Sequence, residues 1–483
     1  MLCAGLDIGT TGCKIVLYDE EGNHVRTSYR EYEISRNKGL HEIDGTAIFD
    51  AVKHVIREAD LREAVSIAVT SFGESFVLLD KEDRPLLPTM LYTDPRGGAE
   101  CADLVKAFGD RELALRTGTK MHEMYSLPKV LWIKKNMPDK YEQAKCILLI
   151  QDYIVYMLSG VRQIDYSLAA RTAVFDIKNK CWMDEVLKWC GVDKRLFSTP
   201  VPSGTIAGKV KGDIASGLGI NREAVIVSGC HDQIAAMTGA NVFEEHQVMD
   251  GTGTVECVPV IMDTPPTEYG IYEKGYSIAP HVNGKYACYV LSYAGGATLK
   301  WFRDNFSDKS YDELNLLVKD EVSDLMIMPH FAGAATPYMN SSSTAAILGL
   351  TFEHGKMDLY KALMEGTAYE IMLNLEVLKE YGIVPQRLIA TGGGARSDVW
   401  LQIKADVLGL PVTALSGDEV GAAGSAYLGG KALAIYDEDT RLLSKRKTFY
   451  PNQAKHESYR RQFKKYKKIY QLVMEVMKED TVC

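Results

Sequence analysis

A short turn rich in glycine and threonine occurs twice in this chain, about half of its length apart. The first reads Asp7-Ile8-Gly9-Thr10-Thr11-Gly12, and the second reads Asp250-Gly251-Thr252-Gly253-Thr254. Each turn follows an apolar run and leads into another, as a tight hairpin between two strands would. A repeated unit with an aspartate at the same relative place predicts a fold that is built twice.

Both turns have the composition of a phosphate-binding loop. Small residues let the backbone approach a phosphate closely, and hydroxyls and free amides donate hydrogen bonds to its oxygens. A single turn of this kind is more often structural, but two facing turns would hold the phosphates of a nucleotide between two halves of a molecule. The residues that we assign to this role are Thr10, Thr11, Gly251, Thr252 and Gly253.

The length of the chain sets its domain organisation. A chain of 483 residues is too long for one core and suits two sizeable domains. Strand patterns alternate with helix patterns in both halves, which predicts an α/β fold. We place the boundary near Asn241–Glu245, giving domains over residues 1–242 and 243–483. A local hairpin is also expected, with Phe76–Leu79 paired to Leu86–Leu91.

Composition excludes several functional classes. The formal net charge of -9 argues against a nucleic-acid partner. The start of the chain lacks a basic leader, and no apolar run reaches the length of a membrane span, so we expect no membrane association. The ten cysteines form no C-x-x-C pair. This pattern predicts a cytoplasmic protein with reduced thiols and no structural metal.

Asp7 stands at the mouth of the first turn. A carboxylate there would repel a phosphate unless a cation stood between them, so its predicted role is to hold Mg²⁺ through water. The alternative is an aspartate that accepts a hydrogen bond within its own turn. Lys14 is either a phosphate contact or a lysine on a strand edge.

Asp232 follows the buried strand pattern of Val225–Gly229 and precedes small residues that begin a helix. This places a carboxylate at the carboxyl end of a strand, where open α/β sheets bind their ligands. Such a group can accept a proton as a general base. The alternative is a plain helix-capping aspartate. The adjacent His231 is expected to be a hydrogen-bonded neighbour.

Two further carboxylates, Glu74 and Asp94, follow strand-like runs in the first half. Ionised carboxylates only accept hydrogen bonds, so such a pair suits a ligand rich in hydroxyls. Phe72 and Tyr92 would supply apolar faces for its carbon skeleton. The alternatives are a solvated loop residue for Glu74 and a turn residue before a proline for Asp94.

A third glycine-rich segment, Gly392-Gly393-Gly394-Ala395-Arg396, leaves a strand and enters a helix. Its backbone can lie flat against a purine or a phosphate. The segment matches neither the Walker pattern nor the dinucleotide pattern, and many strand-to-helix turns carry two glycines for structural reasons alone.

In this order, these motifs resemble the FGGY carbohydrate kinases, a branch of the actin/hexokinase/Hsp70 ATPase superfamily, over the whole chain. The segment Ala345–Glu365 also resembles a signature of the family's second domain. The resemblance implies two RNase H-like domains with a central cleft, the sugar mainly on the first domain and MgATP on the second. It further implies a catalytic base at Asp232, sugar contacts at Glu74, Asp94, Phe72, Asp232 and Gln233, and an adenosine motif that includes Gly393, Gly394 and Arg396.

The resemblance also frames the substrate. Xylulose kinases of this family usually carry Met-His where this chain has Gly73-Glu74, whereas the Asp232-Gln233 pair is shared with glycerol kinases. Length and the C-terminal half are most similar to the xylulose-kinase group. Two carboxylates in the pocket disfavour an anionic substrate, so we expect a neutral ketopentose such as xylulose, with glycerol, ribulose, fuculose or gluconate as alternatives.

The alternative from another functional class is a non-metabolic actin-like ATPase. Such proteins lack a base beside a sugar pocket, and ATP turnover that depends on an added sugar distinguishes the two classes. The expected partners are therefore a small sugar and ATP, with a homodimer compatible with the resemblance.

Overall fold

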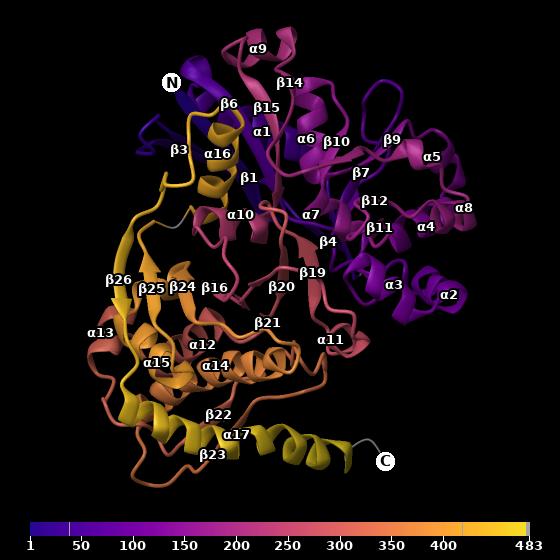
Figure 1. The fold of residues 1–483 in the computed structure, drawn as a ribbon. Helices are drawn as coiled ribbons and strands as arrows, with labels where there is room; N and C mark the ends of the chain where they lie inside the picture. Colours follow the sequence, from indigo (N-terminus) through magenta and orange to yellow (C-terminus); the bar gives the residue numbers. More distant parts are fainter. Residues whose placement is uncertain (38, 418, 480–483) are drawn as a thin grey trace.

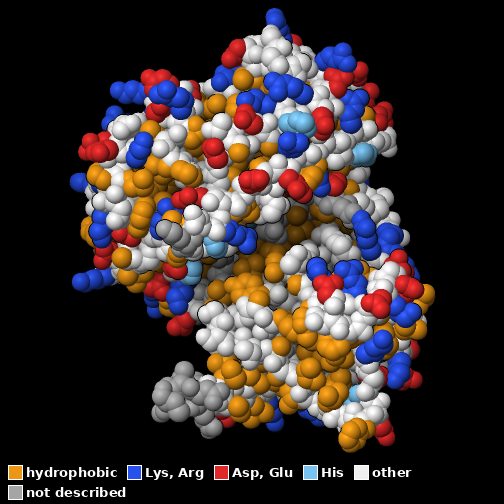
Figure 2. All heavy atoms as spheres, turned by 180° about the vertical axis from the view of Figure 1, so that it is seen from behind, with side chains coloured by type: hydrophobic (Ala, Val, Ile, Leu, Met, Phe, Trp, Pro, Cys, Tyr) orange, Lys and Arg blue, Asp and Glu red, His pale blue; other side chains and the backbone are white. Residues whose placement is uncertain are grey.

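The computed structural model describes residues 1–37, 39–417 and 419–479. It has two α/β domains, one above the other in Figure 1, as the sequence predicts. Figure 2 shows the surface hollowed between them, with hydrophobic side chains inside the hollow. None of the described helices combines the length and the apolar character that a membrane crossing needs.

The first domain is built on a six-stranded sheet with the order β14-β15-β6-β1-β2-β3. Its central strands β1, β6 and β15 are parallel, while β2, β3 and β14 run antiparallel to their neighbours. The central strands are almost entirely apolar because helices cover both faces. The strands of this sheet are β1 (Leu2–Ile8), β2 (Gly12–Tyr18), β3 (His24–Glu31), β6 (Ala64–Ser71), β14 (Thr205–Lys209) and β15 (Val225–His231).

The second sheet repeats this plan. Along β20-β18-β16-β24-β25-β26 the pairings are antiparallel, antiparallel, parallel, parallel and antiparallel, the same sequence as from β3 to β14 in the first sheet. The repeated turn is therefore part of a repeated sheet. Its strands are β16 (Gln247–Thr252), β18 (Val260–Met262), β19 (Ser277–Pro280), β20 (Tyr286–Tyr289), β24 (Arg387–Thr391), β25 (Val412–Leu415) and β26 (Lys445–Phe449), with β17 (Glu256–Cys257) and β21 (Leu291–Ser292) beside β16.

Helices cover both sheets. In the first domain they are α1 (Gly45–Ala59), α2 (Gly98–Phe108), α3 (Asp110–Thr117), α4 (Ser126–Asn136), α5 (Pro138–Glu142), α6 (Ile150–Ser159), α7 (Tyr166–Ala169), α8 (Asp184–Cys190), α9 (Gly212–Leu218) and α10 (Asp232–Gly239). In the second half they are α11 (Tyr269–Glu273), α12 (Gly296–Phe306), α13 (Tyr311–Leu316), α14 (Lys356–Lys379), α15 (Asp398–Leu408), α16 (Val420–Ala432) and α17 (Gln453–Glu479). In α1, apolar residues recur at helical spacing and face the sheet, and Asp44 caps the first turn.

The helix α16 comes from the second half of the sequence but packs against β1, β6 and β15 of the first sheet (Figure 1). It also crosses α10, its counterpart in the repeated plan. The crossing is close because each helix has a glycine that faces the backbone of the other helix. A Cβ on Gly239 would lie 2.1 Å from the carbonyl oxygen of Val420, and one on Gly424 would lie 1.8 Å from the carbonyl oxygen of Ala235. The two domains are thus joined by a backbone-to-backbone helix contact.

One local prediction is wrong. The strand β7 (Phe76–Leu79) exists, but it pairs along its length with β9 (Cys146–Leu149) rather than with Leu86–Leu91. Only a single bridge joins Leu79 to Pro85, and β8 (Thr89–Met90) pairs with β5 (Leu40–Ile43). A fully apolar partner from a distant segment replaces the local hairpin. The remaining short strands are β4 (Ser35–Asn37), β10 (Gln163–Asp165), β11 (Phe175–Asp176), β12 (Cys181–Trp182), β13 (Thr199–Val201), β22 (Met326–Met328) and β23 (Ala346–Leu348).

Candidate active site

Asp232 is the first residue of α10, directly after the end of β15. Its Oδ1 atom is buried and has no hydrogen-bond partner among the described residues. Burial, followed by the negative charges of Asp7 and Glu74, raises the pKa of Asp232 to about 7. An unpartnered acceptor with a pKa near neutrality is suited to take a proton from a bound hydroxyl.

His231 does not compete with Asp232 as a base. Its Nε2 atom lies 3.3 Å from Oδ1 of Asp232, and its Nδ1 atom is 3.4 Å from the hydroxyl of Tyr289. Burial, with a further contribution from the charge of Arg171, holds the pKa of His231 well below its usual value. The ring is therefore neutral and lies beside the carboxylate as a neighbour, as the sequence predicts.

Glu74 lies in a strained turn and is paired to a cation that sequence reasoning missed. Its φ of 64° is in the left-handed region, where non-glycine residues are rare. The Nε atom of Arg171 donates to Oε1 of Glu74 at 2.6 Å. The guanidinium also lies 5.1 Å from the ring centre of Tyr125 and 5.8 Å from that of Tyr289.

Gly73 makes room for this arrangement. A Cβ at this position would lie 2.9 Å from Cγ of Arg171 and 3.0 Å from Cδ2 of His231. A larger residue would therefore displace the ion pair. The isolated Arg171 carries no sequence signal of its own, but the glycine before Glu74 indicates that another side chain needs the space.

The carboxylate of Asp94 is hydrogen-bonded to other residues of the protein. Its carboxylate accepts hydrogen bonds from the Arg96 side chain at 2.7 and 2.8 Å, from the Arg96 amide at 3.1 Å and from the His41 amide at 2.9 Å. Burial alone would raise its pKa, but these bonds hold the pKa below its ordinary value. All four acceptor positions are in use, so a sugar hydroxyl would have to displace one of these partners.

The aromatic residues near the site are arranged differently from the expectation. Phe72 is only 4% exposed and packs in the core of the first domain, which withholds most of its ring from a ligand. Tyr92 is 39% exposed, and the negative charges of Glu74 and Asp232 add to burial in raising the pKa of its hydroxyl. Tyr92 is therefore one of the aromatic side chains near these carboxylates, together with Tyr125 and Tyr289. Gln233 follows Asp232 on α10 and is half-buried.

The first turn is the hairpin between β1 and β2 that the sequence predicts, with Thr10 and Thr11 at its tip. The hydroxyl of Tyr32 donates to the carbonyl of Gly9 and fastens the turn. Enclosure in the protein raises the pKa of Asp7 to about 6. Lys14 is not directed at a phosphate: its Nζ forms an ion pair of 2.5 Å with Glu419, next to the start of α16.

The residues around Asp7 fit a magnesium ion of the kind bound with nucleotides. The described residues contain no group of three or more side chains that could cage a metal ion. Mg²⁺ usually keeps several waters and takes one or two carboxylates together with substrate phosphates, so a single carboxylate at a phosphate turn is sufficient. Burial is the main cause of the raised pKa of Asp7, and the charge of Lys14 offsets it only in part.

The second turn and the third glycine-rich segment meet at one pocket of 900 Å³. They are in contact because a Cβ on Gly392 would lie 2.7 Å from the carbonyl oxygen of Thr252, and one on Gly394 would lie 2.3 Å from its Cγ2. Segments 140 residues apart are thus brought together as the sequence predicts. The pocket is lined by Thr252, Gly253, Gly393, Gly394 and Arg396 and by residues of α12 and α13, whereas Gly251 is part of β16 and does not line it.

The hydroxyl of Thr252 is turned away from this pocket into a buried charge cluster. Lys404 of α15 donates to Asp250 at 2.5 Å, to Glu256 at 2.5 Å and to Thr252 at 2.8 Å, and all three charged side chains are fully buried. Thr252 in turn donates to Asp250 at 2.9 Å. Its proton is therefore donated within the protein, and the assignment of Thr252 to ATP stays a prediction.

Comparisons with known proteins agree with this arrangement. Models of the N-terminal and C-terminal domains of the FGGY family of carbohydrate kinases match residues 2–239 and 252–433. A gluconokinase of Bacillus subtilis is 28% identical over 88% of this chain and 86% of its own. A xylulose kinase of Staphylococcus epidermidis is 24% identical over 96% of both chains. The crystal structure of a xyloylose kinase from Brucella ovis superposes with a TM-score of 0.89 at 25% identity, covering 99% of this chain and 100% of the other.

Proposed function

This chain belongs to the FGGY family of carbohydrate kinases, and from that premise we propose that it transfers the γ-phosphate of ATP to a primary hydroxyl of a neutral sugar. A ketopentose such as xylulose is the first candidate. As a member of this family the chain is a phosphotransferase that uses ATP. The roles of individual residues and the identity of the sugar are the subject of the proposal.

The observation that carries the proposal is the unpartnered Oδ1 atom of Asp232, with the pKa of the group raised to about 7. In the proposed reaction this oxygen accepts the proton of the sugar hydroxyl while the hydroxyl oxygen attacks the γ-phosphorus in line. Because Asp232 is held at the first turn of α10, the reacting hydroxyl is proposed to lie beside this turn.

The sugar is proposed to lie over the Glu74–Arg171 ion pair, with Tyr125 and Tyr289 beside the guanidinium. The pair offers both acceptors and donors to hydroxyls while its charges cancel. This supports a neutral substrate. Gln233 and Tyr92 are proposed as further contacts, and Asp94 would shape the pocket mainly through Arg96.

ATP is proposed to bind between the two glycine-threonine turns, with its base in the pocket that Gly393, Gly394 and Arg396 line. Asp7 would hold Mg²⁺ through water, as its position at the first turn supports. When bound, the ion neutralises charge on the phosphates. An ATP-consuming enzyme whose nine described cysteines are all free also suits the cytoplasm, where we place it.

A sugar acid is the second candidate substrate, because Arg171 places a guanidinium in the pocket and one relative is named a gluconokinase. An ADP-release screen of the purified protein against D-xylulose, D-ribulose, glycerol and gluconate tests the proposal. The expected result is ATP turnover that depends on an added neutral sugar, with D-xylulose giving the highest kcat/KM. ATP turnover that is unaffected by any added sugar would contradict the proposed reaction.

A further inference from the structure

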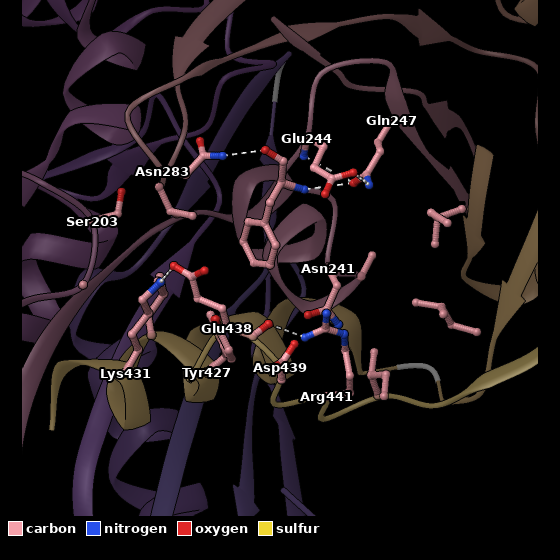
Figure 3. Close-up of a pocket in the computed structure, with 18 of the residues that line it drawn as sticks. Ser203, Asn241, Glu244, Gln247, Asn283, Tyr427, Lys431, Glu438, Asp439 and Arg441 are labelled. Carbon is pink, nitrogen blue, oxygen red and sulfur yellow. Dashed lines mark hydrogen bonds and ion pairs between the residues drawn. The ribbon is translucent and has the colours of Figure 1, made fainter. Parts of the chain in front are cut away.

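A second cavity lies at the far ends of the two helices that start at the active site (Figure 3). The helix α10 begins at Asp232 and ends at Gly239, and α16 begins next to Asp7 and ends at Ala432. Both Ala240 and Ala432 line this cavity, whose volume is 1060 Å³. The 13 residues of α16 span roughly 20 Å, which separates the cavity from the catalytic carboxylates.

The walls of this cavity, which we call the hinge cavity, come from both domains and from the segment that joins them. Ser203 and Gly204 precede β14 of the first sheet, whereas Asn283 lies in the turn between β19 and β20 and Ile389 lies in β24 of the second sheet. The connecting segment 240–247 forms one side of the cavity. Any change in the angle between the domains would therefore change its shape, as expected for a pocket at a hinge.

Amide side chains that line the cavity hold the connecting segment in place. Gln247 accepts a hydrogen bond from the Phe243 amide at 3.1 Å and donates to Glu244 at 2.9 Å. Asn283 donates to the Phe243 carbonyl at 2.5 Å. Figure 3 shows these bonds side by side on one wall. A molecule bound in the cavity would rest directly on this segment.

The cavity contains more positive charge than its own acids neutralise. Arg387 is paired with Glu244 at 3.0 Å, and Lys431 lies 3.9 Å from Glu438. Two further cations, Arg441 and Lys445, have no ion-pair partner within the described part of the chain, and Arg441 donates only to the backbone carbonyls of residues 438 and 440. Only Asp439 remains to offset them, so an anionic group is favoured there.

The rest of the lining suits a small carbon skeleton with hydroxyls. The rings of Phe243 and Tyr427 lie 5.9 Å apart and form an aromatic wall. The Oδ1 atom of Asn241 is buried and has no hydrogen-bond partner in the residues that the structure describes. In Figure 3, Asn241 and Arg441 extend toward the same part of the cavity. An acceptor, cations and an aromatic wall together match a phosphorylated polyhydroxy compound.

We propose that the hinge cavity binds a small phosphorylated, hydroxyl-bearing metabolite, with its phosphate at Arg441 and Lys445, a hydroxyl at Asn241 and its carbon skeleton against Phe243 and Tyr427. Because the walls belong to both domains, the ligand binds one domain arrangement better than another. It therefore changes the affinity of the active site for its substrates, and the substrates change its own affinity by the same factor.

Calorimetric titration tests this site with ribose 5-phosphate, inorganic phosphate and ribose as probes. The titrations are run with D-xylulose and a non-hydrolysable ATP analogue present, so that the proposed catalytic pocket is filled. Two variants are compared: R441Q/K445Q in the cavity, and R460Q/K465Q on the exposed side of α17, which removes the same charge elsewhere. Thermal unfolding of each variant verifies that the fold is intact. Lys445→Glu, at an exposed position, is a third variant, which reverses one charge of the cavity and should also weaken the binding of ribose 5-phosphate.

We expect ribose 5-phosphate to bind the wild type and R460Q/K465Q equally, and more tightly than inorganic phosphate, while ribose does not bind. The R441Q/K445Q variant should bind ribose 5-phosphate at least about tenfold more weakly than the wild type, since two charge-assisted contacts are lost. Equal affinity in all variants, or no binding of either phosphate compound in the millimolar range, would overturn the proposal. Kinase activity is measured separately, so a failure of the proposed reaction is recognised independently.

Discussion

A Cβ atom built on Gly421 would lie 2.6 Å from the Oδ2 atom of Asp7. The start of α16 therefore approaches the end of β1 at a distance that only glycine permits. Through this contact and the Lys14–Glu419 ion pair, the second half of the sequence helps to position the first phosphate turn.

The first prediction follows from this contact. In Gly421→Ala, the added methyl group displaces the Asp7 carboxylate, so we expect kcat/KM for MgATP to fall about tenfold or more, since small misplacements at a reacting site carry large penalties. Steady-state kinetics over a range of MgATP concentrations measure it. Gly98→Ala is the matched control, because open space surrounds that glycine. Unchanged kinetics in Gly421→Ala would separate Asp7 from nucleotide binding.

For Asp232→Asn we expect kcat to fall by about 10²- to 10⁴-fold, the usual range for the loss of a general base. The amide keeps the size of the side chain, so the dissociation constants of sugar and ATP should change little. Calorimetry and steady-state kinetics provide the two measurements. Turnover at the wild-type rate would exclude Asp232 as the base.

The pH dependence of kcat/KM for the sugar follows from the raised pKa of Asp232 in the free enzyme. The base acts in its ionised form, so kcat/KM should rise with pH through a midpoint near the pKa of about 7 and then level off. A group with this pKa titrates between roughly pH 5.5 and pH 8.5. If the chemical step limits the rate, a profile that is flat over this interval would contradict the assignment.

The same group makes a prediction about stability. Its pKa rises from an ordinary value of 3.8 to about 7 on folding, so ionisation of Asp232 opposes folding. The destabilisation is absent below the unfolded pKa, grows as pH rises between the two values and is complete above about 7. Asp232→Asn should therefore have a higher Tm than the wild type at pH 8, and the difference should shrink toward pH 4. A lower Tm of the variant at pH 8 would contradict this account.

The Glu74–Arg171 pair allows a test of substrate choice. In Glu74→Gln, the guanidinium of Arg171 loses its counter-charge, so the pocket loses one negative charge and becomes better suited to a sugar acid. We expect the ratio of kcat/KM for gluconate to that for D-xylulose to rise about tenfold or more, the effect of roughly 1.4 kcal/mol. Glu82→Gln, at an exposed loop position, is the charge-matched control. An unchanged ratio would place the substrate away from this pair.

Much of the fold follows from the sequence because its signals are local and repeated. The turns at Gly9 and Gly251 mark the two β-hairpins, and the parallel strands after them appear as continuous apolar runs. The Phe76–Leu79 strand was assigned the wrong partner because strand pairing depends on contacts between distant segments. Nothing in the sequence near residue 79 indicates that residues 146–149 will lie beside it.

In the active site, too, the residues with a local sequence signal were predicted and those that depend on contacts between distant segments were not. Asp232 was located from its position between a strand and a helix, a signal contained in neighbouring residues. Arg171 and Lys404 were missed because each meets its carboxylate only after folding, from another element. Their partners were visible, but the ion pairs were not, since charged residues in the sequence give no measure of how deeply they will be buried.

The packing of α16 on the first sheet has a consequence for biosynthesis. At ordinary translation rates, roughly 10 to 40 seconds pass between the synthesis of residue 242 and that of residue 432. During that interval the first sheet lacks the helix that covers β1 and β6 in the folded protein. We therefore expect the ribosome-bound intermediate to expose an apolar face and to be prone to aggregation.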